Sequence, residues 1–247
     1  MGNSRSVLRK VSEMYRVADI VFDLPAFGDM PRRMASYEVS SGVPAFMLKE
    51  NDFRFSRWDD LEDIDQRYYM ETGKVFYTRL LQYNGMMLHA SAVAIGGYAY
   101  LFCGPSGMGK STHTKMYLKT FGEKAVIIND DKPAVRKTGG VWYAYGTPWC
   151  GKDGININER VRLGGICFLR RGDTRITRLD LQSTIPYLAG HTLRYIGPDE
   201  MARQLKVMEQ LAGEVPAFEF FNHADSGDAG LTYSVMKAAA EAAFGRV

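Results

Sequence analysis

Residues 104–111 read Gly-Pro-Ser-Gly-Met-Gly-Lys-Ser, a complete phosphate-binding loop, and this stretch decides the fold of the chain. The apolar and aromatic residues 98–103 before it predict a buried strand, and residues 111–120 after it predict a helix. Strand, glycine-rich loop and helix in this order distinguish a working Walker A motif from a chance match. The sequence therefore predicts an α/β domain that binds a nucleoside triphosphate.

Each residue type in the loop has a physical role in holding phosphate. Gly104, Gly107 and Gly109 permit backbone turns that a Cβ would block, so that successive N–H groups can point at phosphate oxygens. The start of the following helix adds the positive end of its dipole. Lys110 is expected to reach the β- and γ-phosphates, and the Ser111 hydroxyl to ligate Mg²⁺. The residues expected to hold ATP are Gly104, Pro105, Ser106, Gly107, Met108, Gly109, Lys110, Ser111 and Thr112.

An acidic pair, Asp130 and Asp131, follows the apolar residues 125–128, as in a Walker B element. A carboxylate at this place can hold Mg²⁺ directly or through water. Two in succession allow one to contact the metal while the other takes the proton of an attacking hydroxyl. The alternative is an Asx-turn at a strand end, before Lys132-Pro133. Next to an intact phosphate-binding loop we favour the functional interpretation, and either aspartate can fill either role.

His89 lies within residues 86–95, which predict a strand, and Gly96-Gly97 then predicts a hairpin turn into residues 98–103. A lone histidine in an apolar strand is more often a packed core residue than a catalyst. The residues around His89 alone therefore favour a structural role.

Composition and charge narrow the class of protein. Of the 247 residues, 46% are hydrophobic and 24% charged, and the net charge of +3 gives no argument for a nucleic-acid partner. The three cysteines form no CxxC pair, which argues against a disulfide framework or a zinc site and fits a reducing cytoplasm. No apolar stretch approaches the roughly 20 residues of a membrane span, and the first residues lack the apolar core of a signal peptide. We expect no membrane partner, and the sequence leaves homo-oligomerisation open.

Two domains are expected: a small β-rich N-terminal module over residues 1–85 and a nucleotide-binding domain over residues 86–247. The module's predicted elements are strands at residues 17–22, 45–49 and 53–57 and a helix at residues 66–81. The second domain's predicted elements are strands at residues 86–95, 98–103, 125–128, 141–145 and 165–169 and helices at residues 111–120, 199–211 and 231–244.

The order of His89, the Gly-Gly turn, the phosphate-binding loop and Asp130-Asp131 resembles the C-terminal catalytic domain of HPr kinase/phosphorylase. The loop and acidic pair are also similar to those of ATP-dependent phosphoenolpyruvate carboxykinase. The short HPr-kinase-like proteins of bacterial peptide-modifying gene clusters share a further motif, Gly-Thr-Pro-Trp, which here is residues 146–149. The resemblance covers about a third of the chain. It implies an HPr kinase/phosphoenolpyruvate carboxykinase-like P-loop domain with a mixed β-sheet.

The resemblance also implies an activity, namely transfer of the γ-phosphoryl group of ATP, with Mg²⁺, to a serine hydroxyl of a peptide or protein. Lys110 would then steady the transferring phosphate, Ser111 would bind Mg²⁺, and Asp130 and Asp131 would supply the base and a second metal contact. His89 would line the same pocket.

The chain departs from the family's pattern in ways that bear on the activity. Thr112 follows the loop serine where the family has another residue type, and Asp153 and Glu159 are only candidates for the family's glutamate near the metal. No counterpart of the phosphorolysis segment is recognisable, so the reverse activity is not expected. Alternative functions are a small-molecule kinase or carboxykinase-like enzyme and, in another class, an ATP-binding or ATPase module that gates assembly without a phosphoacceptor.

The loop of residues 147–152 has two interpretations. Trp149 could clamp a substrate peptide with Lys152 near the phosphates, or the Pro-Trp turn could plug the domain. The sequence does not favour one over the other.

Overall fold

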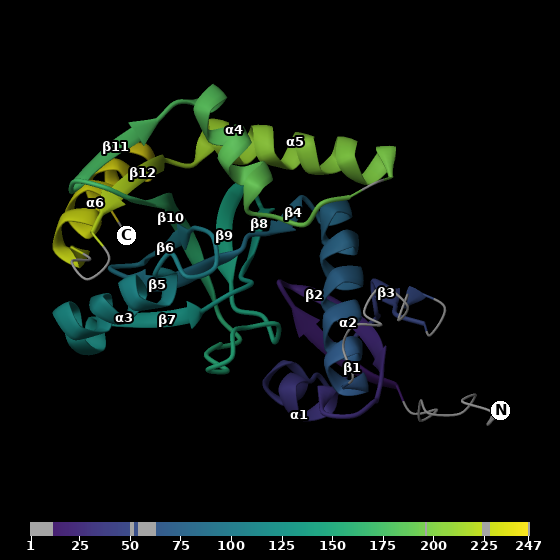
Figure 1. The fold of residues 1–247 in the computed structure, drawn as a ribbon. Helices are drawn as coiled ribbons and strands as arrows, with labels where there is room; N and C mark the ends of the chain where they lie inside the picture. The colour runs from purple at the N-terminus through teal and green to yellow at the C-terminus, as the bar shows by residue number, and fades with distance from the viewer. Residues whose placement is uncertain (1–11, 50–51, 54–62, 196, 224–227, 247) are drawn as a thin grey trace. The chain divides into compact units, whose positions relative to one another are not determined.

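The structure is a computed structural model that describes residues 12–49, 52–53, 63–195, 197–223 and 228–246. The chain divides into two compact units, residues 1–79 and 80–247, called here the N-terminal and C-terminal units (Figure 1). Among the described residues, none of the helices combines the length and the hydropathy needed to cross a bilayer. That residues 1–85 and 86–247 fold as separate domains stays a prediction.

The N-terminal unit holds a small three-stranded sheet with helices, as predicted at the level of a small sheet module. Its elements are β1 (Ser12–Val17), β2 (Ile20–Pro25), α1 (Met30–Met34), η1 (Ala35–Tyr37), β3 (Phe46–Met47) and most of α2 (Ile64–Leu80). The helix predicted at residues 66–81 is confirmed as α2. The strand predicted at residues 53–57 lies outside the described residues, apart from Phe53, which is in no strand.

The strand predicted at residues 17–22 is wrong, because a tight turn divides it. Ala18 and Asp19 both have left-handed backbone angles (φ 51° and 58°), and β1 and β2 pair antiparallel around them. Two central residues with positive φ match the right-handed twist of a two-residue hairpin. β2 continues the sheet by pairing parallel with β3, and the rings of Phe22, Phe46 and Phe76 pack together in this unit.

The C-terminal unit is built on a mixed sheet of nine strands. Seven strands follow one path, in the order β4-β8-β9-β10-β6-β5-β7, and β12 and β11 extend the sheet from β10. The strands are β4 (Gly85–Met87), β5 (Ala90–Ile95), β6 (Tyr98–Cys103), β7 (Ala125–Asn129), β8 (Ala134–Thr138), β9 (Val141–Tyr145), β10 (Arg160–Arg171), β11 (Arg175–Leu179) and β12 (Ala217–Asn222).

Two segments of the chain pass side by side through one bend, and the sheet curls there. One segment runs from β4 to β5 and the other from β7 to β8; β4 pairs with β8, and β5 pairs with β7. Main-chain hydrogen bonds span the bend, from Leu88 N to Pro133 O (3.2 Å) and from Ala90 N to Asp131 O (3.1 Å). The strand predicted at residues 86–95 is therefore two strands, and His89 lies at the break between them.

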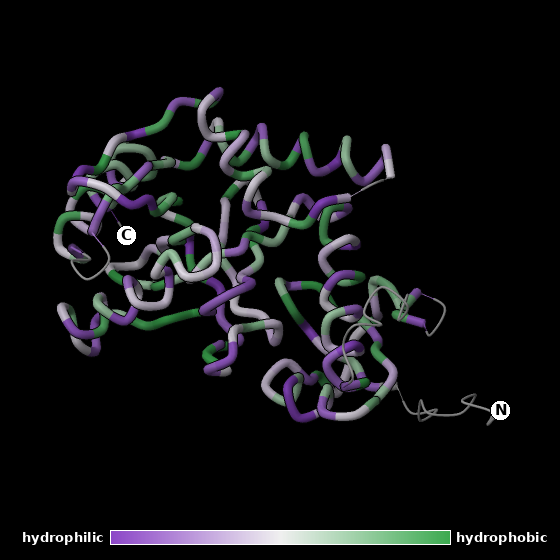
Figure 2. The backbone as a smooth tube through the Cα atoms, in the orientation of Figure 1, coloured by the Kyte–Doolittle hydropathy of each residue, from purple (hydrophilic) through white to green (hydrophobic). Residues whose placement is uncertain are grey.

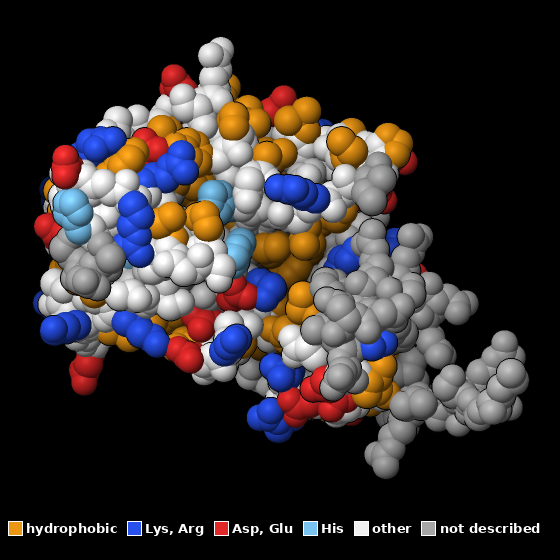
Figure 3. All heavy atoms as spheres, in the orientation of Figure 1, with side chains coloured by type: hydrophobic (Ala, Val, Ile, Leu, Met, Phe, Trp, Pro, Cys, Tyr) orange, Lys and Arg blue, Asp and Glu red, His pale blue; other side chains and the backbone are white. Residues whose placement is uncertain are grey.

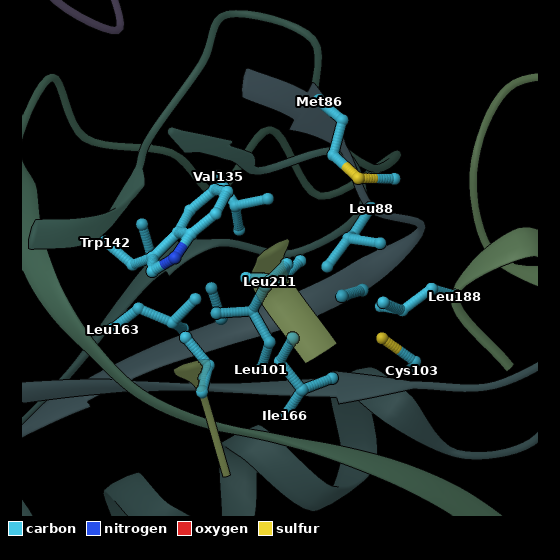
Figure 4. Packing of buried hydrophobic residues seen from close by; sticks show 14 of the residues in the cluster. Met86, Leu88, Leu101, Cys103, Val135, Trp142, Leu163, Ile166, Leu188 and Leu211 are labelled. Atoms are coloured by element: carbon cyan, nitrogen blue, oxygen red, sulfur yellow. The ribbon is translucent and has the colours of Figure 1, made fainter. Parts of the chain in front are cut away.

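Helices cover both faces of this sheet. They are η4 (Leu81–Tyr83), α3 (Lys110–Phe121), η5 (Gly122–Lys124), α4 (Leu181–Gly190), α5 (Pro198–Glu214) and α6 (Ala229–Phe244). One core lies between the sheet and α4 and α5, where Leu188 lies beside Leu88 and Cys103, and Leu211 lies in the middle of the cluster (Figure 4). Hydrophobic and hydrophilic residues alternate along α5 within its successive turns, as expected of a helix with one buried face (Figure 2).

The second core lies on the opposite face, under α3 and α6. Tyr117 of α3 and Met236 of α6 pack there against Phe102 and Phe220 of the sheet. The mixed α/β architecture predicted from the sequence is thus present at the level of layers. α4, β8, β11 and β12 were not predicted.

Candidate functional site

The phosphate-binding loop and the acidic pair lie at one edge of the curled sheet. β5 is antiparallel to both of its neighbours, β6 and β7, with Ala90 opposite Cys103 and Ala92 opposite Asn129. The carboxyl ends of β6 and β7 therefore meet at the same edge, where β5 begins. The loop leaves β6 at Gly104, and the acidic pair leaves β7 at Asp130. Sequence-distant groups are thus brought together by strand order.

The loop has the glycine geometry that the sequence predicts. Gly107 and Gly109 have positive φ angles of 79° and 95°, which favour glycine. At Gly104 a Cβ would lie 3.0 Å from Cγ of Met108, so a side chain there would crowd the loop. Met108 N donates to Pro105 O (3.1 Å), which closes the turn. The backbone thus forms a tight cradle at the start of α3.

Lys110, the first residue of α3, is buried with 8% of its surface exposed. Its Nζ donates to Gly104 O (2.9 Å) and Pro105 O (3.4 Å). Burial lowers the pKa of Lys110, and the charge of Asp131 partly opposes that shift. The ammonium group therefore lies over the loop and within electrostatic reach of the acidic pair.

Of the next two predicted loop residues, Ser111 is half-buried and Thr112 is exposed. One turn further along α3, Thr114 Oγ1 lies 2.8 Å from Ser91 Oγ of β5. This buried contact fixes the start of α3 on the sheet, next to the strand that follows His89.

Asp131 is held by two basic side chains. Its Oδ1 lies 2.9 Å from His89 Nε2, and its Oδ2 accepts a hydrogen bond from Lys132 Nζ. Burial would raise the pKa of the Asp131 carboxyl, but the His89 hydrogen bond and the Lys132 charge outweigh it and hold the pKa well below its ordinary value. Asp131 is therefore ionised at neutral pH, and His89 lies in direct contact with it.

Asp130 is in a different environment. Its Oδ1 accepts a hydrogen bond from Gly151 N (2.6 Å), and the residue is 6% exposed. Burial raises the pKa of its carboxyl, and the charge of Asp131 adds to that rise against the Gly151 hydrogen bond. The two neighbouring aspartates thus have pKa values shifted in opposite directions. On the face in Figure 3, acidic, basic and histidine side chains gather next to one another.

Three residues near this site were not among the predicted site residues. Lys132 forms the ion pair described above, and Arg171, at the end of β10, has Nη2 3.4 Å from Gly107 O. His191 accepts a hydrogen bond from His89 N at its backbone oxygen (2.7 Å), and its Nδ1 lies 2.8 Å from Tyr187 O. Burial lowers the pKa of His191, and the charges of His89 and Lys110 add to the effect. No motif marks His191, because the α4–α5 connection alone brings it here.

The two candidates for an acidic residue near the metal, Asp153 and Glu159, are both exposed. Asp153 accepts a hydrogen bond from Lys115 Nζ on α3 (2.7 Å), and Glu159 lies just before β10.

Trp149 and Lys152, the predicted substrate residues, differ sharply in exposure. Trp149 is 1% exposed, whereas Lys152 is exposed in the turn after Gly151. The burial of Trp149 favours the interpretation that the Pro-Trp turn plugs the domain.

We expect Trp149→Ala to lower the free energy of unfolding by about 3–5 kcal/mol, because it opens a large cavity. Chemical denaturation followed by circular dichroism measures this, with Trp149→Phe as the milder control. Wild-type stability combined with weaker acceptor binding would instead indicate a substrate clamp.

A buried histidine one turn into α3 makes stability depend on pH. His113 is 2% exposed among the rings of Phe102 and Phe220; its Nε2 lies 3.1 Å from Thr232 Oγ1, and Nδ1 has no partner among the described residues. Burial lowers its pKa to about 4 from 6.5. The unfolded chain therefore binds the proton first, and stability present above pH 6.5 is lost as the pH falls towards 4.

This difference in pKa between the folded and unfolded chain lowers the free energy of unfolding by at most about 3 kcal/mol across this pH range. Urea unfolding at pH 7 and pH 4.5 measures it. His113→Phe should remove this part of the pH dependence, and an unchanged slope in that variant would contradict the assignment.

Comparisons with known proteins add little to this geometry. No family model matches the chain, and no curated protein matches its sequence. Among solved structures, the fold is similar to that of the Hpr(Ser) kinase/phosphatase from Coxiella burnetii, with a TM-score of 0.39 and 11% sequence identity. The match covers 62% of this chain and 89% of that chain. Function is therefore inferred from the site itself.

Proposed function

We propose that this chain is an ATP-dependent kinase that transfers the γ-phosphoryl group of ATP to a serine hydroxyl of a peptide or protein. One observation carries the proposal. A phosphate-binding loop with a buried lysine lies at the same sheet edge as two aspartates whose pKa values are shifted in opposite directions. Pairs of titratable groups whose pKa values are shifted apart are typical of sites in which one group acts as acid or base and the other stabilises charge.

The residues present fit a bound ATP–Mg²⁺ complex. A Cβ at Gly104 would crowd Met108, and Gly107 and Gly109 have the positive φ angles that the cradle needs. Lys110 would hold the β- and γ-phosphates. Ser111 and an aspartate would hold Mg²⁺, which supplies positive charge against the phosphates when bound. Among the described residues, no three His, Cys, Asp or Glu side chains form a metal cluster. A P-loop does not require one, because phosphate oxygens and water complete the shell of Mg²⁺.

The two aspartates receive different roles. Asp130 is the proposed base, because its raised pKa makes it the better proton acceptor, and the Gly151 N–H holds its Oδ1 in place. Asp131 is the proposed metal contact, because it stays ionised and is oriented by His89 and Lys132. His89 would act through Asp131 as a positioning residue.

Residues 86–247 would carry the catalytic domain, with the N-terminal module of residues 1–85 in a role that its own residues do not define. Cys103, Cys150 and Cys167 are all buried and none of them forms a disulfide, which supports a reducing, cytoplasmic setting. The acceptor would be a serine-containing peptide or protein.

Phosphotransfer with γ-labelled ATP and Mg²⁺ tests the proposal. The purified protein is incubated with a library of serine-containing peptides and with small hydroxyl compounds, and Lys119→Ala, an exposed position on α3, serves as a matched control for loop variants. Label on a serine peptide is the expected result. Label only on a small compound would indicate a small-molecule kinase, and label released only as free phosphate would indicate a gating ATPase; either result contradicts the proposal.

A further inference from the structure

The loop that follows β9 crosses to the acidic end of β7. Ile157 N donates to Ile128 O (3.0 Å), and Asp130 N donates to Ile155 O (3.3 Å). An isolated antiparallel bridge also joins Asn129 to Asn156. Residues 146–157 are therefore tied to the segment that carries the aspartates, although nothing in the sequence pairs these two segments.

The side chain of Asn129 joins the two segments from inside. Asn129 is fully buried, and its Oδ1 accepts from Asp131 N (3.0 Å) and Lys132 N (2.8 Å). Its Nδ2 donates to Thr147 O (2.9 Å) and lies 3.4 Å from Trp149 O. One amide thus fixes the turn of the acidic pair on one side and the Thr-Pro-Trp turn on the other.

Thr147 closes the same network in the opposite direction. Its Oγ1, also buried, donates to Lys132 O (2.9 Å). The backbone of Lys132 therefore bonds to both partners: its N–H donates to Asn129 Oδ1, and its carbonyl accepts from Thr147 Oγ1. A buried network with these bonds made holds a single geometry.

Two glycines let the loop approach this closely. At Gly146 a Cβ would lie 1.7 Å from Ile157 O, and at Gly151 it would lie 2.7 Å from Asp130 Oδ2 and 2.9 Å from Oδ1. Gly151 also supplies the N–H that binds Asp130 at 2.6 Å. The backbone of Gly151 therefore sits directly against the carboxylate, where a side chain cannot fit without moving it.

We propose that residues 146–151 are a positioning device for the acidic pair, in which Thr147, acting with Asn129, sets the backbone of Asp131 and Gly151 sets the carboxylate of Asp130. This inference rests on the proposed function for its effect on catalysis. It gives the Gly-Thr-Pro-Trp motif a role through the aspartates, with the buried Trp149 as its anchor. Displacement of a catalytic group by about 1 Å can cost on the order of a hundredfold in rate.

Two matched pairs of variants test the device. Thr147→Val keeps the size of threonine and removes its hydroxyl, whereas Thr147→Ser keeps the hydroxyl. Gly151→Ala puts a Cβ against Asp130, whereas Gly213→Ala on α5 adds the same atom where the nearest heavy atom is 4.0 Å away. We expect kcat to fall about tenfold or more in Thr147→Val and Gly151→Ala, and to stay near wild type in Thr147→Ser and Gly213→Ala.

The affinity for ATP distinguishes positioning from general damage. Because the loop of residues 104–111 is untouched, binding of a fluorescent ATP analogue in EDTA should stay within about twofold of wild type in all four variants. Loss of both binding and kcat would indicate a structural role only and would overturn the inference.

A readout without catalysis separates this inference from the proposed function. Carboxyl ¹³C resonances of the free protein should shift for Asp130 in Gly151→Ala and for both aspartates in Thr147→Val. Unchanged resonances or unchanged kcat in both variants would overturn the positioning device. A wild-type protein that phosphorylates no hydroxyl would overturn the proposed function, while the carboxyl resonances would still report on the device.

Discussion

Lys110→Ala is expected to reduce kcat/KM by at least about two orders of magnitude, which corresponds to about 3 kcal/mol of lost transition-state stabilisation. The ammonium group is buried over the loop and bonded to Gly104 O and Pro105 O. Removing it takes away a buried positive charge at the phosphate-binding loop, in surroundings where water screens charge poorly. Steady-state phosphotransfer with the acceptor identified from the library measures the loss.

Lys119→Ala is the matched control, because Lys119 is an exposed lysine near the other end of α3. It should retain wild-type kcat/KM. Wild-type turnover by Lys110→Ala would show that the loop does not hold a reacting phosphate, and the kinase proposal would then fail at its first residue.

Asp130→Asn is expected to lower kcat by a factor of about 10²–10⁴, the range for removal of a general base. The amide has nearly the same shape and can still accept the Gly151 hydrogen bond, so ATP binding and folding should be retained. Because the base must be ionised, wild-type kcat should rise with pH through the raised pKa of Asp130, and this rise should be absent from the variant. A pH–rate profile of both proteins checks this.

Asp131→Asn should lower kcat as much as Asp130→Asn does, but for another reason. The change removes the charge that pairs with Lys132 and His89, so folding stability should also fall, by about 1–2 kcal/mol. Mg²⁺ dependence of the residual activity should weaken in Asp131→Asn and not in Asp130→Asn. The opposite pattern would exchange the two roles.

Local sequence signals predicted the elements around the loop well. The apolar run of β6, the Gly96-Gly97 turn and α3 are all confirmed, because each depends on residues next to it in the chain. The strand predicted at residues 86–95 was wrong at Leu88-His89, because the bend is imposed by pairing with β7 and β8 and has no glycine or proline to mark it. The turn at Ala18-Asp19 was missed because alanine is not a usual residue at positive φ, although aspartate tolerates that conformation.

The site was less predictable than the loop. That His89 lines the same pocket was implied by a resemblance and not by spacing, its contact with Asp131 was not predicted, and Lys132 and Asn129 carried no signal of their own. α4 was missed because it contains Pro186, which opposes a helix in isolation. His191 reaches the site only through that helix and the connection after it. Tertiary contacts therefore supply the second half of the site, and a single sequence does not encode them as a pattern.

At the bend shared by β4–β5 and β7–β8, main-chain hydrogen bonds hold the backbone, and the side chains supply the chemical groups. His89 and Asp131 flank hydrogen bonds made entirely by main-chain atoms, Leu88 N to Pro133 O and Ala90 N to Asp131 O. Replacing either side chain leaves those bonds in place, so the distance between the two backbone positions does not depend on which residues occupy them. The bend thus holds two facing backbone positions at a fixed separation. A different pair of side chains can be placed there, by natural selection or by mutagenesis, without a change in the sheet.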